Sequence, residues 1–71
     1  MYIILEFQSL AGSTAIVPPV VKSDINKAYQ EFYTHCAAAA VSAVEMHTVM
    51  LVYANGNVIE SKTFNHGGEG E

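Results

Sequence analysis

The chain has 71 residues, with three lysines, no arginine and seven carboxylates, so its formal net charge is -4. A chain of this length makes one domain because it cannot divide its core in two. Nucleic-acid binding relies on cations that neutralise phosphates, and three scattered lysines therefore argue against a DNA or RNA partner. The 51% hydrophobic content is too high for disorder. No apolar run approaches the roughly 18 residues of a membrane span, so we also expect no membrane partner.

Residues 2–8 predict the first strand, because β-branched and aromatic residues dominate and the side chains alternate in polarity. Glu6 and Gln8 share one parity. The sequence therefore predicts that Ile3, Leu5 and Phe7 face the core and that the other parity faces outward.

A turn around Gly12 separates this strand from an extended segment that contains Pro18 and Pro19. Proline lacks the backbone amide that a central strand donates to its neighbours. The second strand should therefore be short or lie at the edge of the sheet.

A helix is predicted to begin at Ser23 or Asp24, either of which can cap the first turn, and to end near Ser42. Its apolar positions recur at spacings of three and four, which is typical of a helix packed on one side. These positions are Ile25, Tyr29, Phe32, Cys36, Ala39 and Ala43.

Residues 46–53 and 57–65 read as two strands joined by Asn55-Gly56, which is a strong signal for a tight hairpin. A two-residue loop pairs Tyr53 with Val58, Leu51 with Glu60, Val49 with Lys62 and His47 with Phe64. The opposite face then carries Met50, Val52, Ile59, Thr48, Ser61 and Thr63. A three-residue loop would shift the register by one residue and mix these sets.

The predicted fold class is α+β, with the order β-β-α-β-β and one helix packed on one face of a mostly antiparallel four-stranded sheet. Residues 1–65 should form the single domain. Residues 66–71 should form a flexible, acidic, glycine-rich tail that folding does not need.

Few side chains suggest chemistry. Cys36 lies on the apolar stripe of the helix, which favours a core cysteine, and adjacent residues of a helix point too far apart for His35 to activate it. The separations of His35, His47 and His66 match no compact metal-ligand motif. We therefore expect no catalytic residue, no cofactor site and no metal site.

The carboxylates offer no acid-base pair by this interpretation. Glu6 and Glu60 could be neighbours on the outer face of the sheet, where glutamates are usually solvated. The glycines at 12 and 67–70 lack the context of a phosphate-binding loop. Tyr33 lies off the stripe and is free to contact a partner.

The opening residues 1–9, the alanine-rich segment 37–42, and Glu45 and His47 before a hairpin resemble small proteins encoded in phages and prophages of Gram-positive and gut bacteria. The Pro18-Pro19 pair and the pronounced Asn55-Gly56 turn depart from that family. Its members are of unknown function, so the resemblance implies an accessory or structural phage protein and no site residues.

A single cysteine favours a reducing interior, and the absence of a basic leader argues against export by the general secretory route. We expect the protein in the cytoplasm of a bacterial host cell or associated with the virion. The leading hypothesis is a non-enzymatic, self-associating interaction module. The alternative is a small acidic inhibitor of a host protein, and an enzyme with its site at a subunit interface is a third class.

Homodimerisation follows from a count of sheet faces. One helix covers one face, so the apolar residues of the other face would be exposed in a monomer. The predicted self-association face consists of Tyr2, Ile4, Val49, Leu51, Tyr53, Val58 and Phe64. Two such faces could pack together with twofold symmetry.

Overall fold

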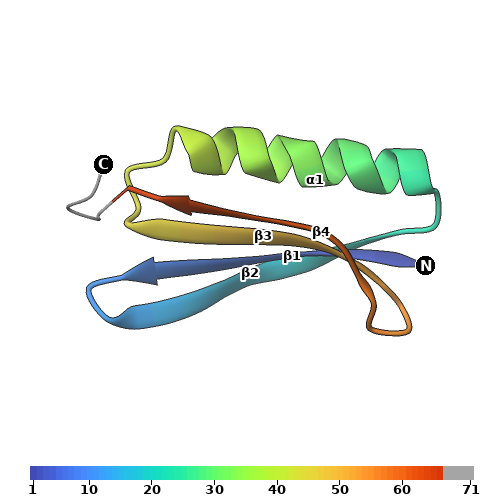
Figure 1. The fold of residues 1–71 in the computed structure, drawn as a ribbon, viewed down its shortest axis with the longest axis horizontal. Coiled ribbons are helices and arrows are strands. Elements are labelled where there is room, and N and C mark those ends of the chain that lie inside the picture. The colour runs from blue at the N-terminus through green and yellow to red at the C-terminus, as the bar shows by residue number, and fades with distance from the viewer. Residues whose placement is uncertain (67–71) are drawn as a thin grey trace.

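The computed structural model describes residues 1–66, and it shows a four-stranded sheet with one helix lying along one of its faces (Figure 1). The elements are β1 (Tyr2–Leu10), β2 (Ser13–Lys22), α1 (Ile25–Ala40), β3 (Met46–Tyr53) and β4 (Val58–Asn65). The strands lie in the order β2-β1-β3-β4, and all neighbouring strands are antiparallel. The predicted α+β fold and its β-β-α-β-β order are confirmed.

The two prolines lie on an edge strand, as predicted. The only strand that pairs with β2 is β1, and the register shifts where Ile4 pairs with Val20 but Glu6 pairs with Val17. Pro18 and Pro19 occupy this irregularity. The missing proline amides are tolerated there because an edge strand has a neighbour on one side only.

The helix begins where the sequence predicts. Asp24 is the N-cap, and its side chain accepts a hydrogen bond of 2.9 Å from the backbone amide of Lys27. The cap satisfies one of the amides that the first helical turn leaves unpaired. At the other end Val41 is the C-cap, so the helix stops just before Ser42.

The predicted register of the β3–β4 hairpin is correct away from the turn and wrong beside it. Leu51 pairs with Glu60, as predicted, but Val58 pairs with Val52 instead of Tyr53. Only Gly56 in the loop has a positive φ, of 98°. A type I′ turn needs a positive φ at both loop residues, so the loop is longer and a bulge follows it.

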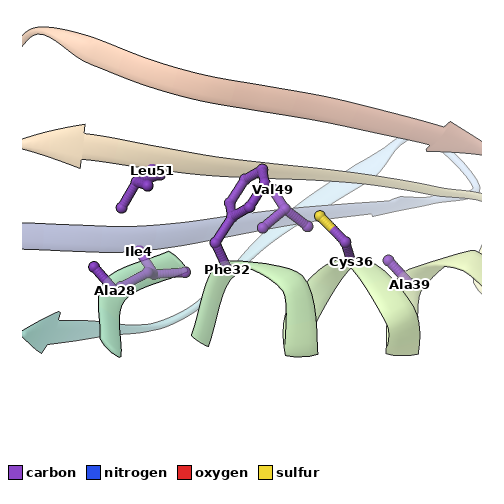
Figure 2. Packing of buried hydrophobic residues seen from close by; sticks show 7 residues of the cluster. All are labelled: Ile4, Ala28, Phe32, Cys36, Ala39, Val49 and Leu51. Carbon is purple, nitrogen blue, oxygen red and sulfur yellow. The ribbon is translucent and has the colours of Figure 1, made fainter. Parts of the chain in front are cut away.

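The core lies between the helix and the face of the sheet that the helix covers (Figure 2). Its members are Ile4, Val49 and Leu51 from β1 and β3, and Ala28, Phe32, Cys36 and Ala39 from α1. Small alanine side chains let the helix approach the sheet closely, and Phe32 fills the centre. Cys36 is buried and free, so its prediction as a core residue is confirmed.

The predicted sheet faces were reversed. Ile4, Val49 and Leu51, which were assigned to the outer face, are fully buried under the helix. The prediction assumed that Glu6 marks a solvated face. Glu6 is instead 7% exposed, because partners in the core satisfy its charge.

The other members of the predicted self-association face lie on both sides of the sheet. Tyr2 and Phe64 pack against the core, and Tyr53 lies edge-on to Tyr2 with the ring centroids 5.2 Å apart. Val58 alone lies on the side away from the helix, because the bulge pairs it with Val52.

Most of the predicted tail lies outside the described residues, since only His66 of residues 66–71 is described. His66 is fixed by two hydrogen bonds. Its backbone amide donates to the carbonyl of Glu45 at 2.6 Å, and its Nε2 atom donates to the carbonyl of Ala39 at 2.7 Å. His66 therefore belongs to the folded part and contacts the C-terminal turn of the helix.

Candidate functional site

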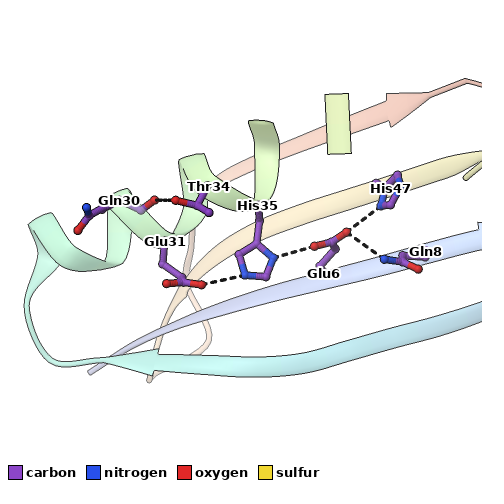
Figure 3. A network of polar contacts seen from close by, with 7 residues as sticks. All are labelled: Glu6, Gln8, Gln30, Glu31, Thr34, His35 and His47. Carbon is purple, nitrogen blue, oxygen red and sulfur yellow. Dashed lines mark hydrogen bonds and ion pairs between the residues drawn. The ribbon is translucent and has the colours of Figure 1, made fainter. Parts of the chain in front are cut away.

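A carboxylate with two imidazole partners lies between the helix and the sheet. Glu6 points from β1 toward α1, where its Oε1 atom is 2.7 Å from Nδ1 of His35 (Figure 3). Its Oε2 atom is 2.7 Å from Nδ1 of His47 on β3 and also accepts a longer bond of 3.3 Å from Nε2 of Gln8. An ionised carboxylate only accepts hydrogen bonds, so both imidazoles donate to Glu6.

His35 connects this carboxylate to a second one. Its Nε2 atom lies 3.1 Å from Oε2 of Glu31, one helical turn earlier. Only a doubly protonated imidazole can donate to Glu6 and Glu31 at the same time. When both ring nitrogens of His35 carry a proton, these hydrogen bonds are charge-assisted and hold the helix to the sheet.

His47 is bound on one side only. Its Nδ1 atom donates to Glu6, while its Nε2 atom is buried and makes no hydrogen bond within residues 1–66. The ring of His66 packs edge-on against it, with the centroids 6.3 Å apart. A carboxylate-bound imidazole can act as a general base, but this Nε2 atom is out of reach of solvent and hence of a dissolved substrate.

The hydrogen bonds decide the charge of Glu6. Burial by itself raises the pKa of this carboxyl, whereas the hydrogen bonds from His35, His47 and Gln8 and the charge of His35 lower it. The hydrogen bonds and the charge prevail, and the pKa of Glu6 lies below its ordinary value. Glu6 is therefore anionic at neutral pH, and its charge is paired inside the protein.

A cavity of about 370 Å³ lies beside this cluster. Its lining consists of Glu6, Gln8, Val17, Thr34, His35, Ala38, Ala39, Ser42 and His47. Thr34 donates to the carbonyl of Gln30, and the acidic and basic groups of the lining bind one another.

Within residues 1–66, no three histidine, cysteine or acidic side chains are arranged to hold a metal ion. The cluster thus links α1 to β1 and β3.

The sequence interpretation missed this cluster. It considered the histidines and the carboxylates separately, but Glu6 contacts both His35 and His47. Glu6 and Glu60, which the sequence interpretation treated as possible neighbours on a solvated face, lie on strands that β3 separates. Helical spacing could have placed His35 on the side of the helix that faces the sheet, because it lies three residues after the buried Phe32 and four before the buried Ala39.

The opposite face of the sheet carries no helix, and we call it the open face. Its members are Ile3, Leu5, Phe7, Ser9, Thr14, Ile16, Val21, Met46, Thr48, Met50, Val52, Val58, Ser61, Thr63 and Asn65. Two hydrogen bonds between hydroxyl groups show that paired residues point to the same face. The Oγ atom of Ser9 lies 3.3 Å from Oγ1 of Thr14, and the Oγ1 atoms of Thr48 and Thr63 lie 3.2 Å apart.

Within the four strands, the open face has no charged residue. All the charged residues of the strands point to the helix side of the sheet, because each is paired with a residue that faces the helix. They are Glu6, Lys22, Glu60 and Lys62. A solvated face of an antiparallel sheet is usually polar. Here the edge residues Ile16, Val21 and Val58 are 63%, 55% and 53% exposed. The open face therefore combines exposed aliphatic side chains with uncharged hydroxyl and amide groups.

No protein-family model, curated protein or solved structure matches this chain. In the part of the chain that the structure describes, no helix is long and apolar enough to cross a membrane.

Proposed function

We propose that this protein is a non-enzymatic interaction module that associates with a second copy of itself through the open face. The observation that supports the proposal is the absence of charge from the open face in residues 1–66, together with its exposed aliphatic residues. Desolvating this face costs little, because no ionised group has to leave water.

The size of the open face suits a small homodimer. Four strands of about eight residues, spaced by about 4.8 Å and rising about 3.4 Å per residue, cover a projected area of roughly 500 Å². Side chains that stand out from this plane add further accessible surface. A standard interface buries about 800 Å² on each partner, so two such faces can form an interface near the lower end of the range.

A second copy is a fitting occupant because a charge-free surface is compatible with itself. Twofold symmetry brings the same patch of both subunits together, and any charge near the axis would meet its own kind. Burial of apolar surface contributes roughly 25 cal/mol for each Å². The free energy gained by burying the two open faces would exceed the several kcal/mol that association costs. Two packed sheets would lie about 10 Å apart.

The resemblance of residues 1–9 and 37–42 to proteins of phages and prophages supports a phage origin for this module. We propose that it serves as an accessory or structural protein of a phage, in the host cytoplasm or on the virion.

The proposal is tested by lysine substitutions at two exposed aliphatic residues, one on the open face and one away from it. Ile16 lies on the open face and Val41 lies at the end of the helix, and they are 63% and 85% exposed. Lysine at either position should leave the fold intact. Sedimentation velocity should show that Ile16→Lys weakens self-association while Val41→Lys has the mass distribution of the wild type.

Equal behaviour of the two variants would contradict the proposal. A wild-type protein that stays at the 7.7 kDa mass of one chain over the whole concentration range would also contradict it.

A further inference from the structure

The two edges of the sheet differ in their readiness to accept another strand. The β2 edge carries Pro18 and Pro19 and a shift of register, which are features that block the pairing of strands. The β4 edge has no proline, and all its residues except Phe64 are exposed. An exposed edge strand presents unpaired backbone amides and carbonyls to a neighbouring molecule.

The middle of β4 carries one charge of each sign. Glu60 and Lys62 are both exposed, and they point to the helix side because they pair with Leu51 and Val49. Neither residue forms an ion pair within residues 1–66. Ser61 lies between them and points to the open face.

From this arrangement we propose that β4 pairs in antiparallel fashion with β4 of a second copy, about a twofold axis at Ser61. In this register Glu60 lies opposite Lys62 of the partner subunit, and Lys62 lies opposite Glu60 of the partner subunit. Directly opposed side chains of antiparallel strands are close enough for opposite charges to attract. The backbone hydrogen bonds hold the strands together, and the two ion pairs select the register.

The two neighbouring antiparallel registers, and parallel pairing in register, oppose like charges. A twofold axis at Glu60 places that carboxylate against itself, and an axis at Lys62 does the same for the ammonium group. Parallel pairing in register also brings Glu60 against Glu60. Like charges directly opposite one another destabilise a strand pair, so the sequence Glu60-Ser61-Lys62 favours the axis at Ser61.

Edge pairing and face packing use different surfaces. The edge contact extends each sheet to eight strands and leaves the open face uncovered. A chain that makes both contacts therefore assembles beyond a dimer. The edge contact does not depend on the proposed function and is tested separately from it.

The test is an exchange of charges in an Ile16→Lys background, which weakens packing through the open face. The single variants Glu60→Lys and Lys62→Glu should each associate roughly tenfold more weakly than this background at low salt, because two attractive pairs become repulsive. An equimolar mixture of the two variants should recover association, since lysines of one chain then face glutamates of the other. Sedimentation equilibrium measures all three samples.

Lys27→Glu is the matched control, because Lys27 is exposed on the helix and the substitution changes the net charge as Lys62→Glu does. By itself Lys27→Glu should associate as the background does, because it leaves Glu60 and Lys62 in place. The proposal is overturned if the background does not associate, if Glu60→Lys and Lys62→Glu associate as the background does, if their mixture does not recover association, or if Lys27→Glu weakens association as much as Lys62→Glu. None of these results affects the test of the open face, which compares Ile16→Lys with Val41→Lys.

Discussion

Nδ1 of His47 lies 2.7 Å from Oε2 of Glu6, although 41 positions separate the two residues in the chain. This contact allows a carboxylate to lie within the core layer under the helix. Because Glu6 is satisfied there, the face of β1 that contains Ile4 becomes the covered face. Ile3, Leu5 and Phe7 consequently point away from the helix.

Glu6→Gln should lower the free energy of unfolding by about 2 kcal/mol, because an amide has one accepting oxygen and leaves either His35 or His47 without its buried partner. Urea unfolding followed by circular dichroism measures this loss. The matched control is Glu31→Gln, which removes the other carboxylate of His35 at a more exposed site and should cost about 0.5 kcal/mol. Equal losses for the two variants would mean that burial of Glu6 is unimportant.

Stability should fall in acid. The pKa of Glu6 is lower in the folded chain than its unfolded value of about 4.3, so the unfolded state binds the proton first as the pH falls. The stabilisation by Glu6 is present above about pH 4.3 and disappears as the pH falls through the lower folded value. Thermal melts between pH 3 and pH 6 should show this loss, and Glu6→Gln should reduce its size. An unchanged pH dependence in the variant would assign the loss to other carboxylates.

Leu51→Lys and Met50→Lys should have opposite consequences. Leu51 is fully buried in the core, so a lysine there should unfold a domain of this size. Met50 lies on the open face, so its variant should keep the helical circular dichroism signal and lose self-association. A folded Leu51→Lys together with an unfolded Met50→Lys would restore the face assignment made from sequence.

Cys36 should react slowly with a thiol reagent until the chain unfolds. Burial raises the pKa of the Cys36 thiol, Lys62 lowers it, and Glu6 and Glu60 raise it. The net pKa is raised, which reduces the thiolate that reacts. Alkylation at pH 8 should accelerate by more than tenfold in denaturing urea. The same rate with and without urea would contradict the buried position.

Local patterns predicted the elements of the fold well. Asp24 marked the helix start, Pro18 and Pro19 marked an edge strand, and Asn55-Gly56 located the second hairpin. These signals depend on backbone conformation and hydrogen bonding over a few residues. They are therefore visible in the sequence without knowledge of contacts between distant elements.

The buried face could not be predicted in the same way, because both parities of β1 and β3 are apolar. The one polar marker, Glu6, suggested the wrong face. Its burial depends on His35 from the helix and His47 from another strand, which are 29 and 41 positions away. A tertiary contact reversed the interpretation of a local pattern.

Intermolecular nuclear Overhauser effects test self-association through the open face most directly. In an isotope-filtered experiment on a mixture of labelled and unlabelled protein, only contacts between different chains give cross-peaks. We predict such cross-peaks among the methyl groups of Ile3, Leu5 and Met50, whose side chains would meet across the interface. A mixture without these cross-peaks, at concentrations where sedimentation shows a dimer, would contradict packing of the two open faces.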